Sequence, residues 1–93
     1  MSTDRKNIQR FQDIPNIGPA MERDFIQLGL KQPAELIGQD PYQLYQQLST
    51  ITGVRQDPCV LDTYMAAVDY MQGGSAKKWW EFTKLRKKNY PQL

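Results

Sequence analysis

The feature that most constrains this sequence is the way proline and glycine divide it into short segments. Proline follows an acidic residue at Asp40-Pro41 and Asp57-Pro58. This pairing is typical of helix starts, because proline has no N–H group to leave unpaired at the first helical position. Gly29, Gly53 and Gly73 follow apolar runs, where a left-handed cap ends a helix. No segment shows strand alternation, so the sequence predicts an all-α fold.

Between these boundaries, apolar residues recur at helical spacing. A first helix with candidate caps at Ser2, Thr3 and Asp4 is expected to stop near Asp13, because Ile14 precedes a proline and is pushed towards extended geometry. The other four predicted helical segments cover residues 19–28, 33–37, 41–52 and 58–72. An amphipathic C-terminal helix is predicted over residues 76–88. The expected fold is therefore about five helices plus a C-terminal basic helix.

Length and composition limit the class of protein. Ninety-three residues suffice for one core, and 40% apolar with 24% charged residues is ordinary for a folded globular chain. The lone Cys59 cannot form an internal disulfide, and residues 1–10 are polar where a secretory signal is apolar. No window approaches the roughly 18 apolar residues of a membrane span. We therefore expect a cytoplasmic protein with no membrane partner.

Charge is distributed unevenly along the chain. Residues 1–76 carry six basic and nine acidic side chains, a net charge of −3, whereas residues 77–93 carry six basic and one acidic, a net charge of +5. We divide the chain accordingly into a helical domain, 1–76, and a basic aromatic C-terminal helix and tail, 77–93, packed on that domain. This asymmetry fits a contact with nucleic acid or an acidic partner, and it equally fits a solvated helix that keeps the protein in solution.

The C-terminal segment also has an apolar stripe. Trp79, Phe82 and Leu85 are three residues apart and are predicted to pack inward. A tryptophan among lysines can stack on a base while the ammonium groups contact phosphates. The alternative is a solubility surface on which lysine stems cover Trp80. The residues predicted to contact nucleic acid here are Lys77, Lys78, Trp80, Lys84, Arg86, Lys87 and Lys88.

The turn over residues 14–20, Ile-Pro-Asn-Ile-Gly-Pro-Ala, joins the first two predicted helices. A tight turn of this kind leaves backbone N–H groups at the start of the second helix, where the helix dipole favours an anion such as a phosphate. Gly18 is expected to supply the unusual dihedral angles and so to resist replacement by valine, while Ile14 and Ile17 anchor the turn in the core. The alternative is a compact connector that only packs two helices.

Together these segments resemble a known family. The turn and the Leu28-Gly29-Leu30 segment are similar to a helix-hairpin-helix DNA-binding motif. The match to the bacterial pathogenicity-locus family, also called mitomycin-resistance-like helix-hairpin-helix proteins, covers about residues 11–82. It rests further on Ala34-Glu35-Leu36, Asp40-Pro41, Leu44-Tyr45, Leu48 and residues 52–62. The resemblance implies a bacterial protein with two tandem hairpins, the second at residues 52–57, and no settled biochemical function.

The first hairpin departs from the DNA-binding pattern. Asn16 stands where that pattern has its first glycine, which is tolerable because asparagine visits the left-handed region. Glu22 places a negative charge in the first helical turn, and Arg23 is the compensating base. The residues of this hairpin predicted to contact nucleic acid are Asn16, Ile17, Gly18, Ala20 and Arg23.

The second hairpin is predicted to be structural. It contains Gly53, Val54 and Arg55, of which Arg55 is the only positive residue. Asp57, as the helix cap, is expected to occupy the N–H donors that a phosphate would need.

The sequence offers little for catalysis. It has no histidine, no glycine-rich nucleotide loop, and no metal-ligand spacing. We therefore predict a protein that is not an enzyme and needs no cofactor or metal. The expected function is a nucleic-acid-binding module of weak sequence selectivity, with duplex or single-stranded DNA as partner. The alternative is a protein-interaction adaptor built on the same fold.

Overall fold

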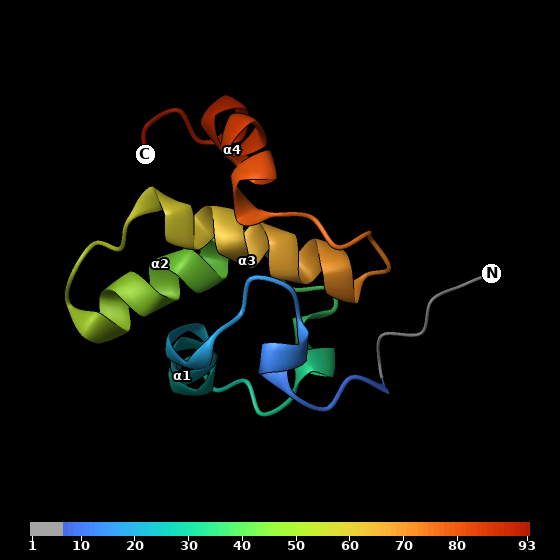
Figure 1. Cartoon of the computed structure of the whole chain (residues 1–93). Helices are drawn as coiled ribbons and strands as arrows, with labels where there is room; N and C mark the ends of the chain where they lie inside the picture. The colour runs from blue at the N-terminus through green and yellow to red at the C-terminus, as the bar shows by residue number, and fades with distance from the viewer. Residues whose placement is uncertain (1–6) are drawn as a thin grey trace.

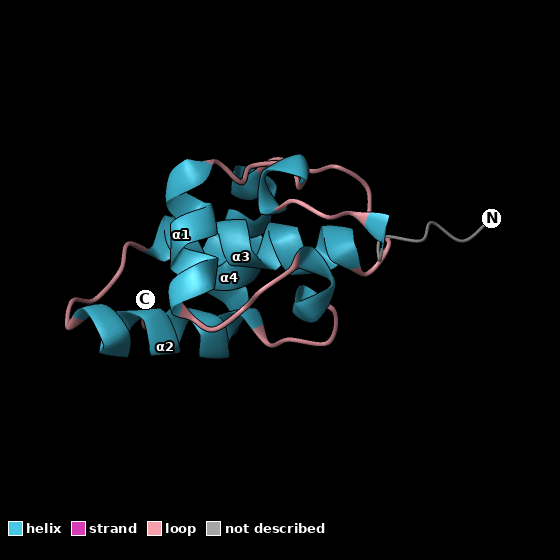
Figure 2. Ribbon diagram, turned by 90° about the horizontal axis from the view of Figure 1, so that it is seen from below, coloured by secondary structure: helices cyan, strands magenta, loops and turns pink. Residues whose placement is uncertain are grey.

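A computed structural model describes residues 7–93, and these contain helices and loops but no strand (Figure 2). The described part of the chain has four α-helices, namely α1 (Pro19–Gln27), α2 (Pro41–Thr52), α3 (Pro58–Met71) and α4 (Thr83–Asn89). It also has three short 3-10 helices, η2 (Phe11–Asp13), η3 (Pro33–Leu36) and η4 (Trp79–Phe82). The predicted all-α class is confirmed. No described helix is long and apolar enough to cross a membrane.

Helix α3 is the centre of the fold. It packs on α2, on η3 and on the C-terminal elements η4 and α4. In Figure 1, α1 lies on one side of the α2–α3 layer and α4 on the other. The buried core joins residues from most elements: Phe11, Ile14, Ile17, Phe25, Leu30, Leu36, Leu44, Tyr45, Leu48, Leu61, Tyr64, Ala67, Val68 and Met71.

Local signals set most helix boundaries as predicted. The carboxylate of Asp40 accepts a hydrogen bond from the Tyr42 N–H at 3.0 Å, so it caps α2. Gly29 and Gly53 follow α1 and α2 with φ of +88° and +71°, the left-handed conformation in which glycine has no steric penalty. These caps stop each helix where the sequence predicts.

The prediction of a regular helix before residue 14 is wrong for the described residues. Residues 8–10 are not helical, and Phe11–Asp13 forms a single 3-10 turn. Ile14 is extended, with ψ of 132°, because the following proline disfavours the helical region. The candidate caps Ser2, Thr3 and Asp4 lie outside the described residues.

The C-terminal segment is not one continuous helix over residues 76–88, as predicted. It begins as the 3-10 turn η4 and becomes α-helical at Thr83. A 3-10 helix advances about 120° per residue instead of about 100°, so four such residues rotate the side chains of α4 by roughly 80°. Leu85 is consequently 44% exposed, and Arg86 is turned towards α3 instead. The expectation that Leu85 packs inward is wrong.

The end of the described chain returns to α2. The Tyr90 ring stacks on Tyr42, with centroids 4.3 Å apart and planes at 7°. Leu93 packs against the buried core. Burial raises the pKa of Tyr90. The lysine-rich helix is thus fixed at both ends, by η4 on α3 and by Tyr90 on α2.

Candidate nucleic-acid interface

Arg86 belongs to the interior of the protein. Its Nε lies 2.8 Å from Asp62 Oδ1, and both side chains are buried. Thr83 Oγ1 donates to the other carboxylate oxygen, Asp62 Oδ2, at 2.7 Å. The hydrogen bond to Asp62 raises the pKa of Arg86, against the opposing effect of burial. Arg86 therefore joins α4 to α3, and we correct its assignment as a nucleic-acid contact.

Lys77 is also engaged within the protein. Its ammonium group lies 3.2 Å from Asp69 Oδ2 and 5.6 Å from the centre of the Phe82 ring. The side chain is 40% exposed, so the pair is partly solvated and contributes little to stability. Its charge is largely balanced by Asp69, which reduces what it can offer to a phosphate.

The other four basic residues of this segment point outward. Among the described residues, the ion pairs involve neither Lys78 nor the three lysines of α4. A shallow groove on η4 and α4 is lined by Leu85, by Lys84 and Lys88, and by the acidic residue Glu81. The four exposed lysines of this C-terminal segment are Lys78, Lys84, Lys87 and Lys88.

Two adjacent tryptophans precede these lysines. The rings of Trp79 and Trp80 are 5.6 Å apart and nearly perpendicular, at 84°. Trp79 is half-buried, whereas Trp80 is 58% exposed. The predicted separation of an inward Trp79 and an outward Trp80 agrees with this arrangement.

In the first turn Asn16 adopts the left-handed conformation that the sequence allows it, whereas Gly18 does not adopt the unusual dihedral angles predicted for it. Asn16 holds the left-handed conformation, with φ of +73°. Gly18 is the N-cap of α1 in an extended conformation, φ −103°, and a Cβ placed on it meets no atom within 4 Å. Ile14 and Ile17 are buried, as predicted. Gly18 therefore does not supply an unusual dihedral angle.

The start of α1 faces solvent. Pro19, Ala20 and Arg23 are exposed, and Gly18 has no side chain to cap the first-turn N–H groups. Glu22 accepts a hydrogen bond from Gln12 Nε2 at 3.0 Å, which occupies one oxygen of the carboxylate that opposes an anion. The start of α1 thus has no side-chain cap, and the exposed Arg23 lies five residues after the N-cap.

The structure links the first turn to the beginning of the basic segment but not to its lysine-rich helix. Asn16 Nδ2 donates to the backbone oxygen of Lys77 at 2.8 Å. Helix α1 packs on α2 and η2, whereas α4 packs on α3 and η4, on the other side of the layer in Figure 1. The two predicted halves of the interface are therefore two separate surfaces.

The second turn is tied together internally, though not by the predicted cap. Asp57 occupies the N-cap position of α3, but its side chain accepts no capping hydrogen bond, so that expectation is wrong. Instead, the Tyr45 hydroxyl donates to the Gln56 backbone oxygen, and Gln56 Nε2 donates to Thr52 Oγ1 at 3.0 Å. Val54 and Arg55 are exposed at the tip. The structural role expected of Gly53, Val54 and Arg55 stays a prediction.

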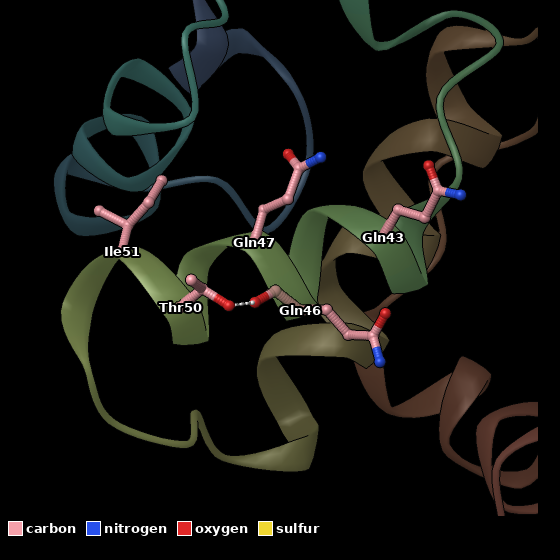
Figure 3. Close-up of a pocket in the computed structure, with 5 residues that line it drawn as sticks. All are labelled: Gln43, Gln46, Gln47, Thr50 and Ile51. Atoms are coloured by element: carbon pink, nitrogen blue, oxygen red, sulfur yellow. Dashed lines mark hydrogen bonds between the residues drawn. The ribbon is translucent and has the colours of Figure 1, made fainter.

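A second shallow pocket lies along α2 (Figure 3). Its lining is uncharged, and Thr50 Oγ1 donates to the Gln46 backbone oxygen at 3.1 Å. Ile51 is 53% exposed and lies on the side of α2 towards α1 in Figure 3. The lining residues are Gln43, Gln46, Gln47, Thr50 and Ile51. This surface offers hydrogen bonds and apolar contact but no ionisable group.

Replacing Asn16 and Gly18 separately tests which of the two residues the first turn requires for its backbone conformation. We expect Asn16→Val to lower the free energy of unfolding by about 2–3 kcal/mol, because a branched residue is strained at this φ and the bond to Lys77 is lost. We expect Gly18→Ser to be neutral or slightly stabilising, because serine is a favoured N-cap and space is available. Urea denaturation of both variants gives the comparison. A lower free energy of unfolding for Gly18→Ser than for Asn16→Val contradicts the conformations described for this turn.

The sequence interpretation missed Asp62. It lies between the core residues Leu61 and Tyr64, in a run otherwise read only for its apolar pattern. A carboxylate buried in the middle of such a run needs a charged or hydrogen-bonding partner. The need for a partner is therefore the sequence signal that could have identified Asp62, and it indicates a basic residue elsewhere in the chain.

These features define a small all-helical protein with a lysine-rich surface and two internally braced turns. The pathogenicity-locus family, Cdd1, matches residues 4–88, and the chain belongs to that family. A mitomycin resistance protein, McrB, from Streptomyces lavendulae is 42% identical over 73 residues, which cover 78% of this chain and 70% of the relative. No solved structure is similar at a significant level.

Proposed function

We propose that this protein is a non-catalytic nucleic-acid-binding module whose main contact surface is formed by the lysines of segment 78–88. The proposal rests on the contacts of the six basic residues in segment 77–88, which differ between two of them and the other four. Lys77 and Arg86 are paired with carboxylates of α3, while the remaining four are exposed and outside the ion pairs of the described chain. Exposed lysines on one short segment suit a row of phosphates.

The two turns support a tandem helix-hairpin-helix interpretation of the same fold. Each turn is followed by a helix with proline at its first positions, α1 after residues 14–18 and α3 after residues 53–57. The first turn adds exposed backbone donors near Arg23, and we propose that it holds a single phosphate. The interface thus consists of a major surface on η4–α4 and a minor one at the start of α1.

The salt dependence of binding tests the major surface. We expect Lys84→Gln, Lys87→Gln and Lys88→Gln together to make the log–log salt slope on a 20-base-pair duplex less steep by about 3, since each phosphate contact contributes roughly 0.9. Arg86 is left intact because it is internal. Fluorescence anisotropy from about 50 to 200 mM salt measures the slope.

A matched control removes three charges elsewhere. Arg10, Lys31 and Arg55 are exposed and lie outside the proposed surface, so changing all three to glutamine alters net charge equally. We expect the slope of this variant to stay close to that of the wild type. Equal slopes for both triple variants, or no wild-type binding at about 50 mM salt, contradict the proposal.

A protein-interaction adaptor is the second candidate, and the exposed apolar residues favour it. Ile26, Ile51 and Val54 are 59%, 53% and 62% exposed on α1, α2 and the second turn. Ile51 also lines the neutral pocket of Figure 3, and exposed apolar side chains of this kind suit a partner with few charges. Excess duplex DNA should leave such a partner bound and displace one that uses the lysines.

A further inference from the structure

We infer that the η4–α4 surface prefers single-stranded nucleic acid, with Trp80 as a stacking platform for an unpaired base. This inference rests on the proposed function and specifies its ligand. Trp80 is 58% exposed at the start of the lysine-rich segment. Lys78 precedes it and Lys84 lies four residues after it, so positive charge is present on both sides in the sequence.

The position of the Trp80 ring is set by its neighbour. Trp79 is half-buried and meets Trp80 at 84°, so the two rings are not stacked in parallel. Because Trp79 does not stack in parallel on Trp80 and Trp80 is 58% exposed, part of the Trp80 side chain is accessible to solvent. An aromatic ring held in this way loses little conformational freedom when a base stacks on it.

The groove on α4 continues the same surface. Leu85, 44% exposed, lines this groove together with Lys84, Lys88 and Glu81, so the groove combines an apolar side chain with two lysines and one carboxylate. A nucleotide chain presents this combination of apolar ring faces and phosphates only when its bases are unstacked. A duplex hides the ring faces and offers phosphates alone. The surface therefore matches a single strand better than a duplex.

Two substitutions at position 80 separate stacking from simple apolar contact. We expect Trp80→Leu to weaken binding to a 20-nucleotide oligothymidylate by roughly 5- to 150-fold, the loss of one stacked base, and to change duplex binding by less than about twofold. Trp80→Phe keeps an aromatic ring and should recover much of the affinity. Ile51→Ala, at a similarly exposed apolar residue on α2, should have no effect.

Anisotropy titrations with the oligothymidylate and with a 20-base-pair duplex give every comparison, and thermal melting confirms that each variant is folded. Tighter wild-type binding to the single strand, lost in Trp80→Leu and retained in Trp80→Phe, is the expected result. Equal affinity for both probes, or equal losses on both probes in Trp80→Leu, overturns the single-strand inference and leaves the proposed function standing. Failure of the wild type to bind either probe overturns both.

Discussion

Asp62→Ala is expected to lower the free energy of unfolding by about 3–5 kcal/mol, because it leaves the Arg86 guanidinium buried without its counter-charge. Asp62 is fully buried, and its two oxygens accept hydrogen bonds from Arg86 and Thr83. Small domains have only about 5–15 kcal/mol of stability in total. Urea denaturation should therefore show a variant close to unfolding. Arg86→Met should lower the free energy of unfolding by a similar amount, because it leaves the buried Asp62 carboxylate without a counter-charge.

Combining the two changes provides the discriminating measurement. Replacing a buried ion pair by apolar side chains of similar volume is often neutral or stabilising. We therefore expect Asp62→Leu with Arg86→Met to be considerably more stable than either Asp62→Ala or Arg86→Met. Lys87→Gln, next to Arg86 but exposed, should change stability by less than about 0.5 kcal/mol. Single variants as stable as Lys87→Gln would show that the pair is unimportant.

Phe25→Ala is the second large effect that we expect, with a loss of about 3–5 kcal/mol in the free energy of unfolding. Phe25 is fully buried, and its ring lies 5.2 Å from Phe11 and 5.1 Å from Tyr64. Phe25 thus connects α1 both to η2, which contains Phe11, and to α3, which contains Tyr64. Removing it leaves a cavity that the fixed backbone cannot close.

The neighbouring residue is a natural control for this experiment. Ile26 lies on the same helix but is 59% exposed, so Ile26→Ala should cost less than about 0.5 kcal/mol. Phe25→Leu retains much of the volume and should fall between the two. Chemical denaturation of the three variants gives the comparison. A similar loss for Phe25→Ala and Ile26→Ala would contradict the packing described for α1.

Much of the fold follows from local chemistry, which is why the sequence predicts it. The start of α2 depends on Asp40 and Pro41, and its end depends on Gly53, all within one turn of the backbone groups that they affect. The buried face of α1 follows from the spacing of its apolar residues. Such signals act over three or four residues and need no knowledge of the tertiary structure.

The candidate interface is less predictable because its orientation depends on distant residues. Whether Arg86 faces solvent or α3 is decided by Asp62, 24 residues earlier, and by the phase change that η4 introduces. A count of the basic residues in segment 77–88 treats all six alike. Tertiary contacts pair two of them with carboxylates of α3 and leave the other four outside the ion pairs of the described residues. Likewise, the unusual dihedral angles expected of Gly18 are absent, because a motif fixes residue types more firmly than dihedral angles.

The hydrogen bond from Asn16 to Lys77 also has a consequence for the order in which the protein folds. It joins positions 61 residues apart, so the first turn lacks one of its bonds for as long as the later segment is absent. During synthesis the N-terminal residues emerge first. This one bond can therefore form only after Lys77 has been synthesised, and contacts of such long sequence separation are slow to form. The turn before α1 therefore gains its full set of hydrogen bonds only when the segment that contains Lys77 packs against it.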